Sequence, residues 1–423
     1  MARIESVCLG GRYCDIAGVA VEWSINRRSK QVDILPQVFW TDGNPWREAN
    51  LWAFERAFDN NVEALTVLAE ITTLASYATW LELNDLEWIH FPDRKMDRCL
   101  FRYRGDLIEA RDAGRLAPST TSERMRVVIS FYRWARSNGL LSQLLPLWRD
   151  KSVRISQSNL FGIARTYTVL SSELAIPNRK SPSDAPENGL MPVSSNDRDE
   201  ILRFALEKSS IEIFLLLSLG FFTGMRLGTL SDLKIETLEN ALPDPRCEDL
   251  FRLHIGPGAR PPVATKFGIT GFTYIPRILL NQLRAYVEGT RRLLRETKAK
   301  QENRRLVFLT KHGNPYAQRG VDKSVAVNVE MHALRKKATA AGMEMACTFK
   351  FHQTRATFGT ELARLALKYA NATEAISMVK EALLQRSELS ALHYIRFVER
   401  TPIKIEIANE FTRSFIGAFE EKK

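Results

Sequence analysis

The chain has 423 residues, of which 45% are hydrophobic, and this length exceeds one ordinary core and predicts two or three domains. Sixty Lys and Arg against 49 Asp and Glu give a formal net charge of +11, which suits a partner that carries many phosphates, although basic charge can also serve solubility alone. The five cysteines show no CxxC pair, so they predict reduced thiols of a cytoplasmic protein and exclude a disulfide framework or a zinc site: Cys8, Cys14, Cys99, Cys247 and Cys347.

Neither a signal peptide nor a membrane span is expected from the sequence. Residues 1–5 lack the apolar stretch of a signal peptide. The most apolar window, residues 213–225, is too short to cross a bilayer and runs directly into Arg226. We expect this window to form a buried helix.

Residues 1–50 mix short β-rich runs with Gly and Pro turns. The runs at residues 18–25 and 31–40 predict a small β-containing arm or cap. All eight tryptophans, from Trp23 to Trp148, lie in the first half of the chain. This break in composition favours separate domains.

Apolar residues recur with helical periodicity over residues 46–148, so a compact helical domain is predicted over residues 51–174. The clearest helix begins with a capping box, Thr120-x-x-Glu123, and ends at the Asn-Gly pair of residues 138–139. Its apolar stripe consists of Met125, Val128, Ile129 and Tyr132.

The other face of this helix is basic and could follow a DNA backbone by point charges. A solvated helix surface would look the same. The residues of this face are Arg124, Arg126, Arg133 and Arg136.

Residues 175–195 are polar and rich in proline, which predicts a linker. Helices dominate again beyond it, over residues 196–402, with one β-like interruption. A long charged helix is expected from Arg277 to about Asn303. The β-like pattern within this region predicts three short strands separated by glycine turns, at residues 250–255, 263–266 and 272–276.

Four features in this second half could carry chemistry, and the first is an apolar helix that ends at Thr223-Gly224 and is followed at once by Met225-Arg226. This ending would hold the guanidinium of Arg226 at the floor of a site. Arginine suits a phosphate because its planar fork donates two parallel hydrogen bonds and never loses its charge. Alone, the segment also fits a helix-ending glycine followed by a surface arginine.

The second feature is His352 and Arg355, which would share one helix face and could reach one phosphate together. A metal site is not indicated, because arginine is not a ligand and no second His or carboxylate lies at a matching spacing. The third feature is Lys266, between two short strands, where a lysine can swing over a reacting bond and lend its proton. An incidental helical pair and a surface lysine are the ordinary alternatives.

The fourth feature is Tyr394, in the segment Leu-His-Tyr-Ile-Arg-Phe near the end of the sequence. Most tyrosines pack in a core. A tyrosine can also act as a nucleophile, since a phenolate attacks phosphorus once its charge is shared with nearby cations.

Taken in order, Thr-Gly-Met-Arg, the hairpin lysine, His-x-x-Arg and the late Tyr-Ile-Arg resemble the catalytic domain of the tyrosine recombinase, or phage integrase, family. The resemblance covers about residues 190–400. It implies a mainly α protein of several domains with a small β-hairpin or sheet. A helical core-binding domain (residues 51–174) and a linker (175–195) would precede a catalytic domain (196–402) of the DNA breaking-rejoining fold.

The resemblance also implies roles for the site residues. Arg226 and Arg355 would clamp the scissile phosphate, and His352 would assist with the proton or a phosphate oxygen. Lys266 would protonate the leaving 5′ oxygen while Tyr394 attacks. Positioning and charge neutralisation supply most of the catalysis in phosphoryl transfer, so no metal, ATP or other cofactor is expected.

The sequence departs from the family pattern at several positions. Gln385 stands nine residues before the nucleophile, where the family usually has His or Trp, and it can donate a hydrogen bond but cannot carry charge or move a proton. Thr229 replaces an acidic residue often found three after the first arginine, and Ala356 replaces a His that often follows the second. The interval from Arg355 to Tyr394 is also longer, with an extra stretch near residues 368–380. These changes are expected to affect the rate and the regulation of the reaction more than the type of reaction.

An amphipathic helix is predicted over residues 403–423, because apolar residues recur there at every fourth position: Ile407, Phe411, Phe415 and Phe419. It could pack against its own domain. In the family that the chain resembles, such a segment docks into a neighbouring protomer, which implies a monomer in solution and a homo-tetramer on DNA.

The sequence therefore predicts a site-specific recombinase that cuts and rejoins double-stranded DNA through a 3′-phosphotyrosyl intermediate. It would be cytoplasmic, nucleoid-associated when bound to DNA and independent of membranes, and accessory recombinases or DNA-bending proteins are compatible partners. Two alternatives stay open, a type IB topoisomerase and a catalytically inactive DNA-binding relative. Sequence-independent relaxation of supercoils by a monomer would favour the topoisomerase.

Overall fold

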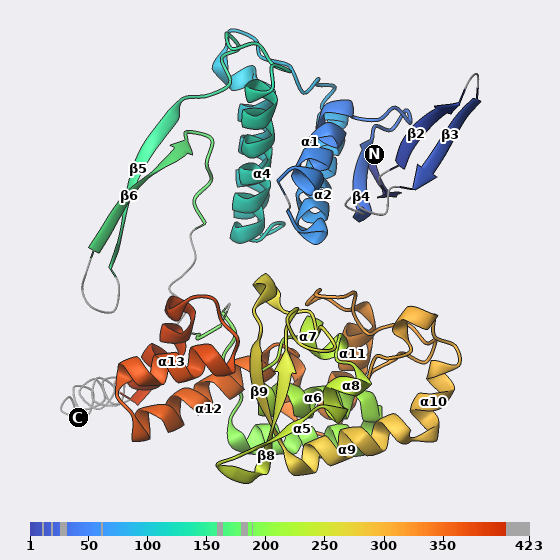
Figure 1. Cartoon of the computed structure of the whole chain (residues 1–423). Coiled ribbons are helices and arrows are strands. Elements are labelled where there is room, and N and C mark those ends of the chain that lie inside the picture. Colours follow the sequence, from blue (N-terminus) through green and yellow to red (C-terminus); the bar gives the residue numbers. More distant parts are fainter. Residues whose placement is uncertain are drawn as a thin grey trace, which may run out of the picture. The chain divides into compact units, whose positions relative to one another are not determined.

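The computed structural model divides the chain into two compact units, Met1–Pro182 and Ser183–Lys423 (Figure 1). Each unit has its own hydrophobic core. The residues that the structure describes are 1–10, 12–17, 20–25, 32–60, 62–158, 164–178, 185–187 and 189–402.

The N-terminal unit begins with two small antiparallel sheets. β1 (Arg3–Leu9) pairs with β4 (Val32–Phe39), and β2 (Arg12–Ala17) pairs with β3 (Ala20–Ile25). The predicted β-rich runs are confirmed, since β3 and β4 fall inside them.

Aromatic side chains dominate the helical core of this unit. The ring centroid of Trp46 lies 5.2 Å from that of Phe131, and the buried hydroxyls of Tyr77 and Tyr132 satisfy each other at 2.9 Å. The helices are α1 (Arg47–Phe58), α2 (Ala64–Leu83), α3 (Cys99–Asp112) and α4 (Pro118–Ser137), with a 3-10 turn, η1 (Lys95–Asp97), before α3.

The start of α4 differs from the prediction. Its N-cap is Ala117 and its first residue is Pro118, so Thr120 lies inside the helix and the predicted capping box is wrong. Proline suits a first helical position because the N–H that it lacks would be unpaired there. Glu123 instead accepts two hydrogen bonds from Arg126, at 2.5 and 2.8 Å. The predicted apolar stripe is confirmed, since all four of its side chains are buried: Met125, Val128, Ile129 and Tyr132.

The helical domain expected over residues 51–174 ends in a β-hairpin instead, formed by β5 (Asp150–Ser158) and β6 (Ala164–Ser172). β6 contains the β-branched residues Thr166, Thr168 and Val169, and β5 contains Val153 and Ile155; such residues favour extended backbone. Val153 and Val169 face each other in this pair and are 44% and 39% exposed. The described side chains at residues 150–154 and 168–170 are all exposed, so this part of the hairpin shows no buried apolar face from which a strand is predicted.

α2 is the one described helix that is long and apolar enough to cross a membrane by length and composition. A core helix of a soluble domain passes the same test. Val67, Ile71, Leu74 and Ala78 of α2 are buried in the aromatic core of the N-terminal unit, so the structure already accounts for much of its apolar character.

The described part of the C-terminal unit surrounds a three-stranded antiparallel sheet, in the order β7 (Leu242–Asp244), β8 (Cys247–Ile255) and β9 (Gly271–Pro276). Its 3-10 turns are η2 (Lys266–Gly268), η3 (Gln301–Asn303) and η4 (Glu344–Thr348). Residues 388–402 are also helical. The other helices are α5 (Ser195–Lys208), α6 (Ile211–Thr223), α7 (Leu227–Ser231), α8 (Ile235–Glu239), α9 (Arg277–Glu288), α10 (Thr290–Glu296), α11 (Val325–Ala340), α12 (Gln353–Tyr369) and α13 (Ala372–Ala382).

α6 lies at the centre of the core of this unit and packs against α5, α12 and β9. Ile213, Leu216 and Leu217 are fully buried. The prediction that the apolar window is a buried helix is therefore confirmed.

Two local predictions in this unit are wrong. Residues 263–266 are not a strand: the N–H of Val263 donates to the Gly256 carbonyl at 3.0 Å and that of Ala264 to the carboxylate of Asp232 at 2.7 Å, so neither joins a ladder. The helix expected from Arg277 to Asn303 is broken at Gly289, whose extended backbone (φ −71°, ψ 143°) ends α9 and precedes α10.

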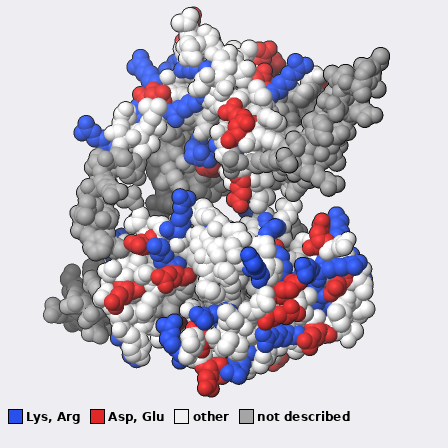
Figure 2. Space-filling model, in the orientation of Figure 1, with Lys and Arg blue, Asp and Glu red and all other residues white. Residues whose placement is uncertain are grey.

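Charges of both signs are interspersed on the visible face of each unit. Figure 2 shows Lys and Arg lying among Asp and Glu rather than gathered in one large patch on this face. The net charge of +11 thus gives no single-sign patch on this face.

Candidate active site

Arg226 follows the end of the core helix α6. Gly224 caps this helix with φ +63°, a left-handed conformation that glycine adopts without steric cost. Arg226 is then the N-cap of α7 and is half-buried. Burial, together with the nearby charge of Arg355, lowers the pKa of Arg226. Its guanidinium makes no hydrogen bond or ion pair with another described residue, although the nearby charges of Glu187 and Asp322 oppose this lowering.

α12 places the second arginine beside the end of α6. Arg355 is 2% exposed, and it donates from Nη1 to the Gly224 carbonyl at 2.7 Å and from Nη2 to the Leu383 carbonyl at 3.0 Å. Its Nε bonds the carboxylate of Glu187 at 3.0 Å. His352, the N-cap of α12, lies 3.1 Å from the same carboxylate oxygen. The two residues thus reach one anionic group, as their spacing predicted.

Tyr394 lies in the helix of residues 388–402, with its ring packed against α12. The ring faces Gly359, where an added Cβ would collide with it. Tyr394 is 1% exposed, and its hydroxyl donates a hydrogen bond to Oε2 of Glu187. Burial and then the charge of Glu187 raise the pKa of Tyr394, and Arg355 acts in the opposite direction. The phenol is therefore held in its protonated form.

One carboxylate from the predicted linker thus joins three of the predicted catalytic residues. Oε1 of Glu187 faces His352 and Arg355, and Oε2 accepts from Tyr394. Burial opposes ionisation, but the hydrogen bond from His352 and the charge of Arg355 lower the pKa of Glu187 to about 2. Glu187 is therefore an anion at the centre of the site.

The same residues border a pocket of about 520 Å³. Arg226, Lys266 and His352 line it together with Glu187. Asp322 also lines it and accepts a hydrogen bond from the N–H of Gly228 in α7 at 3.0 Å, which anchors the helix that follows Arg226. Five predicted catalytic residues are thus brought to one region, three in the pocket lining and two linked to it through Glu187.

Lys266 occupies an exposed turn between β8 and β9, so it lies in a hairpin connection as predicted. Asp232, the C-cap of α7, accepts a hydrogen bond from the N–H of Ala264 at 2.7 Å and so ties the loop to α7. The exposed ammonium group lies 5.3 Å from the ring centroid of Phe267. Lys266 is therefore an exposed residue of the pocket lining.

Gln385 and the basic face of α4 are not part of this arrangement. Gln385 is buried, and its Oε1 has no partner among the described residues. It does not line the pocket. On α4, Arg133 pairs with Asp150 at 2.6 Å and Arg136 donates to the Leu145 carbonyl at 2.5 Å. With Arg126 bonded to Glu123 as well, three of the four arginines make contacts inside their own unit, and their binding of DNA stays a prediction.

Within the described ranges, no group of three or more His, Cys, Asp or Glu residues is arranged to hold a metal ion. The four cysteines whose side chains are described are free thiols: Cys8, Cys99, Cys247 and Cys347.

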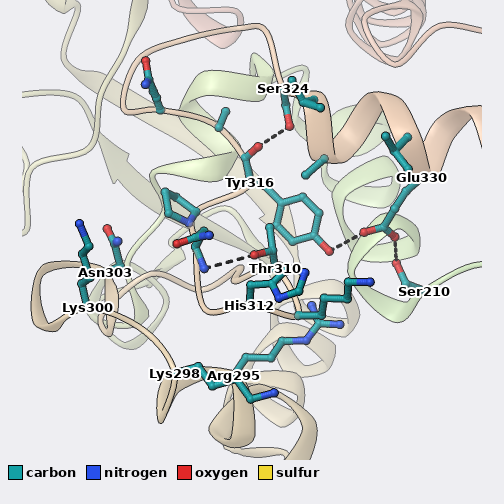
Figure 3. A pocket seen from close by; sticks show the side chains of 18 of the residues that line it. Ser210, Arg295, Lys298, Lys300, Asn303, Thr310, His312, Tyr316, Ser324 and Glu330 are labelled. Atoms are coloured by element: carbon teal, nitrogen blue, oxygen red, sulfur yellow. Dashed lines mark hydrogen bonds between the residues drawn. The ribbon is translucent and has the colours of Figure 1, made fainter. Parts of the chain in front are cut away.

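A second, larger cavity of about 1520 Å³ lies beside α10 and the start of α11 (Figure 3). Glu330 bonds both Tyr316 and Ser210, as Figure 3 shows. Arg295 pairs at 3.0 Å with Glu212, which is fully buried. None of the predicted catalytic residues lines this cavity, so it is a weaker candidate for the predicted chemistry than the pocket at Glu187. Its basic residues are Arg291, Arg295, Lys298, Lys300, Lys311 and Lys323.

Sequence reasoning missed the carboxylates of the site. Glu187 stands in a proline-rich stretch that carries the signs of a linker, and nothing in its neighbourhood marks it as part of a site. Asp232 and Asp322 bond backbone N–H groups from distant parts of the chain, a pairing that no local pattern encodes.

No protein-family model matches the chain, and no curated protein matches it by sequence. The solved structures that it is similar to include integrases. The integrase of transposon Tn1549 in complex with a circular intermediate DNA is 13% identical, with a TM-score of 0.48 over 82% of this chain and 94% of that chain. Lambda integrase bound to DNA is 13% identical, with a TM-score of 0.46 over 84% of this chain and 96% of that one. Lambda integrase in a tetramer bound to a Holliday junction is also 13% identical, with a TM-score of 0.45 over 81% of this chain and 76% of that one. At these identities and TM-scores, the similarity does not show which activity this chain has.

Proposed function

We propose that this chain is a site-specific DNA recombinase of the tyrosine type. One observation carries the proposal: the Tyr394 hydroxyl, the His352 imidazole and the Arg355 guanidinium all bond one buried carboxylate. A tyrosine hydroxyl held beside two groups that bind an anion is the arrangement needed for attack on a phosphodiester. Arg226 adds an unpaired guanidinium to the same pocket.

In the proposed reaction a DNA phosphate takes the place of the carboxylate. The Tyr394 oxygen forms a bond to phosphorus, and the bond from phosphorus to the 5′ oxygen breaks. Lys266 gives a proton to that leaving oxygen, while His352 takes the phenolic proton. Arg226 and Arg355 neutralise the charge that spreads over the non-bridging oxygens. Rejoining is the same step in reverse, because the phosphotyrosyl bond keeps the energy of the broken linkage.

Double-stranded DNA is the substrate that best fits this chemistry and the basic net charge of +11. The roles of the individual residues, the 3′-phosphotyrosyl intermediate and the assembly into a tetramer on DNA are all parts of the proposal.

A nicked suicide substrate tests it, because loss of a short leaving strand traps the protein on DNA. DNA fragments from the region that flanks the gene would be screened, and we expect a covalent adduct that disappears in Tyr394→Phe. An adduct that forms on any sequence, with relaxation of supercoils by the monomer, would favour a topoisomerase. Binding to a fragment without any adduct would indicate a DNA-binding protein that has lost catalysis.

A further inference from the structure

We infer that Glu187 is an internal substitute for the scissile phosphate and holds the protein without DNA in an inhibited state. DNA cleavage then requires that the segment that carries Glu187 leave the site. The inference rests on the proposed function, since it concerns the same pocket.

The hydrogen bonds of Glu187 are those that a phosphodiester would need. A carboxylate offers two anionic oxygens, and here they are shared among a guanidinium at 3.0 Å, an imidazole at 3.1 Å and the phenol of Tyr394. A phosphodiester likewise offers two non-bridging oxygens to the same donors. Two anions cannot occupy this position together, because they would repel each other and compete for the same hydrogen atoms.

The contact also holds the nucleophile in an unreactive form. The hydroxyl of Tyr394 donates its hydrogen to Glu187. The group that the nucleophile faces is thus a carboxylate, which contains no phosphorus to attack. Tyr394 is 1% exposed and Arg355 2% exposed, so an incoming phosphate cannot reach either group without a rearrangement. Removal of the Glu187 carboxylate would free a tyrosine and an arginine at once.

The backbone at Glu187 forms a short turn that is held by hydrogen bonds. The N–H of Leu190 donates to the Glu187 carbonyl at 2.8 Å, which closes a short turn in which Gly189 has φ +79°. The side chain of Gln353 holds the turn to α12 through the carbonyl of Met191 at 3.1 Å. The segment is anchored further along the chain by buried Val193, whose N–H donates to Oγ1 of Thr357 at 2.8 Å. Release of Glu187 therefore requires displacement of the turn that lies before Val193, while the site residues on α12 keep their places.

Binding of inorganic phosphate to the full-length chain tests this inference without DNA. Isothermal titration calorimetry would compare wild type with Glu187→Gln and Glu187→Ala. We expect both variants to bind phosphate at least about tenfold more tightly, since the competing anion is gone. Glu200→Gln, on the exposed surface of α5, is the matched control and should leave the affinity unchanged. Adding Arg226→Ala to Glu187→Ala should abolish the gain.

Equal phosphate affinity in wild type and both Glu187 variants would overturn the inference. So would tighter binding that persists in the double variant, because the phosphate would then be bound elsewhere.

The rate of adduct formation on the suicide substrate, at DNA concentrations below saturation, is the second readout. An inhibitory Glu187 predicts faster trapping in Glu187→Gln, whereas slower trapping would assign Glu187 a positioning role and contradict the inference. If no variant forms an adduct, the proposed function fails while the phosphate titration still decides whether Glu187 guards an anion site.

Discussion

The two arginines of the pocket face the same anion but are held in different ways. Arg355 is buried and bonded to two main-chain carbonyls as well as to Glu187. Arg226 is half-buried, without a partner for its guanidinium in the described part of the chain. Arg355 therefore contributes to folding and to the site, whereas Arg226 is free to serve the site alone.

Replacing each arginine by alanine should separate these contributions. Both variants should lose cleavage by at least ~10²-fold, as expected when a donor to a developing oxyanion is removed. Arg355→Ala should also lower the free energy of unfolding by about 3–5 kcal/mol, because it leaves the Glu187 anion buried without its partner. Arg226→Ala should change it by less than about 1 kcal/mol. Urea unfolding followed by circular dichroism measures the difference, and equal destabilisation by the two variants would contradict this assignment.

Lys266 is expected to act as the acid for the leaving oxygen, since it lines the pocket and is exposed; Lys350 is also an exposed lysine of this lining. Lys266→Ala should slow cleavage of ordinary DNA and recover on a substrate with a 5′-thio leaving group, which needs no proton. Single-turnover rates on the two substrates make the comparison. Failure of the thio substrate to restore the rate would remove this role from Lys266.

Glu187 should make the stability of the protein depend on pH in acid. Its pKa in the folded protein is about 2, below the ordinary value of 4.5. A depressed pKa contributes stability above pH 4.5, and this contribution is lost as the pH falls through about 2. The difference in free energy of unfolding between wild type and Glu187→Gln, at most about 3 kcal/mol, should therefore be constant above pH 4.5 and shrink below it. A difference that stays unchanged down to the acid limit of folding would show that Glu187 is not ionised in this way.

At the scale of elements, α12 organises the site. Its first turn carries Arg355 and its N-cap is His352. In its middle, Gly359 has no side chain and so leaves room for the ring of Tyr394. Figure 1 shows α12 next to α13, and the two pack together in a small core that includes Tyr394. The position of the nucleophile thus depends on the close approach that one glycine allows.

Gly359→Ala tests this dependence. A glycine in a helix interior is ordinarily improved by alanine by about 1 kcal/mol, but here the new methyl group would collide with the ring of Tyr394. We expect a loss of stability of ~1–3 kcal/mol and a strong loss of adduct formation. Gly105→Ala in α3 is the matched control, because nothing lies within 4 Å of its added Cβ, and it should be neutral or stabilising in thermal unfolding. Equal melting temperatures for the two variants would show that the ring has room to move.

The elements that could be predicted from the sequence are those with a strong local signal. α6 has a mainly apolar sequence and a glycine that ends it, and His352 and Arg355 lie at helical spacing. The hairpin of β5 and β6 could not be predicted, because its described side chains at residues 150–154 and 168–170 are all exposed. The place of Glu187 could not be predicted either, since it depends on contacts with residues 165 to 207 positions away along the chain.

At the scale of the whole molecule, the chain consists of two compact units joined near residue 182. The proposed activity needs both a site that cuts and a surface that holds DNA. The structure supplies candidate residues for the first in the C-terminal unit. The predicted apolar stripe of residues 403–423 lies outside the described residues, so its docking to a neighbouring protomer stays a prediction.

Deletion of residues 403–423 tests that prediction. The shortened protein should still bind one DNA site as a monomer but should no longer form the higher complexes that join two sites. Native gels with one-site and paired-site DNA distinguish these species. Unchanged oligomers on DNA would mean that the terminal stripe packs against its own unit.

The most direct test of the account is mass spectrometry of the trapped protein–DNA complex after digestion with protease and nuclease. We predict a nucleotide joined through its 3′ phosphate to the peptide that contains Tyr394. A nucleotide attached to any other residue, or no attachment under conditions in which the chain binds and bends the same DNA, would contradict it.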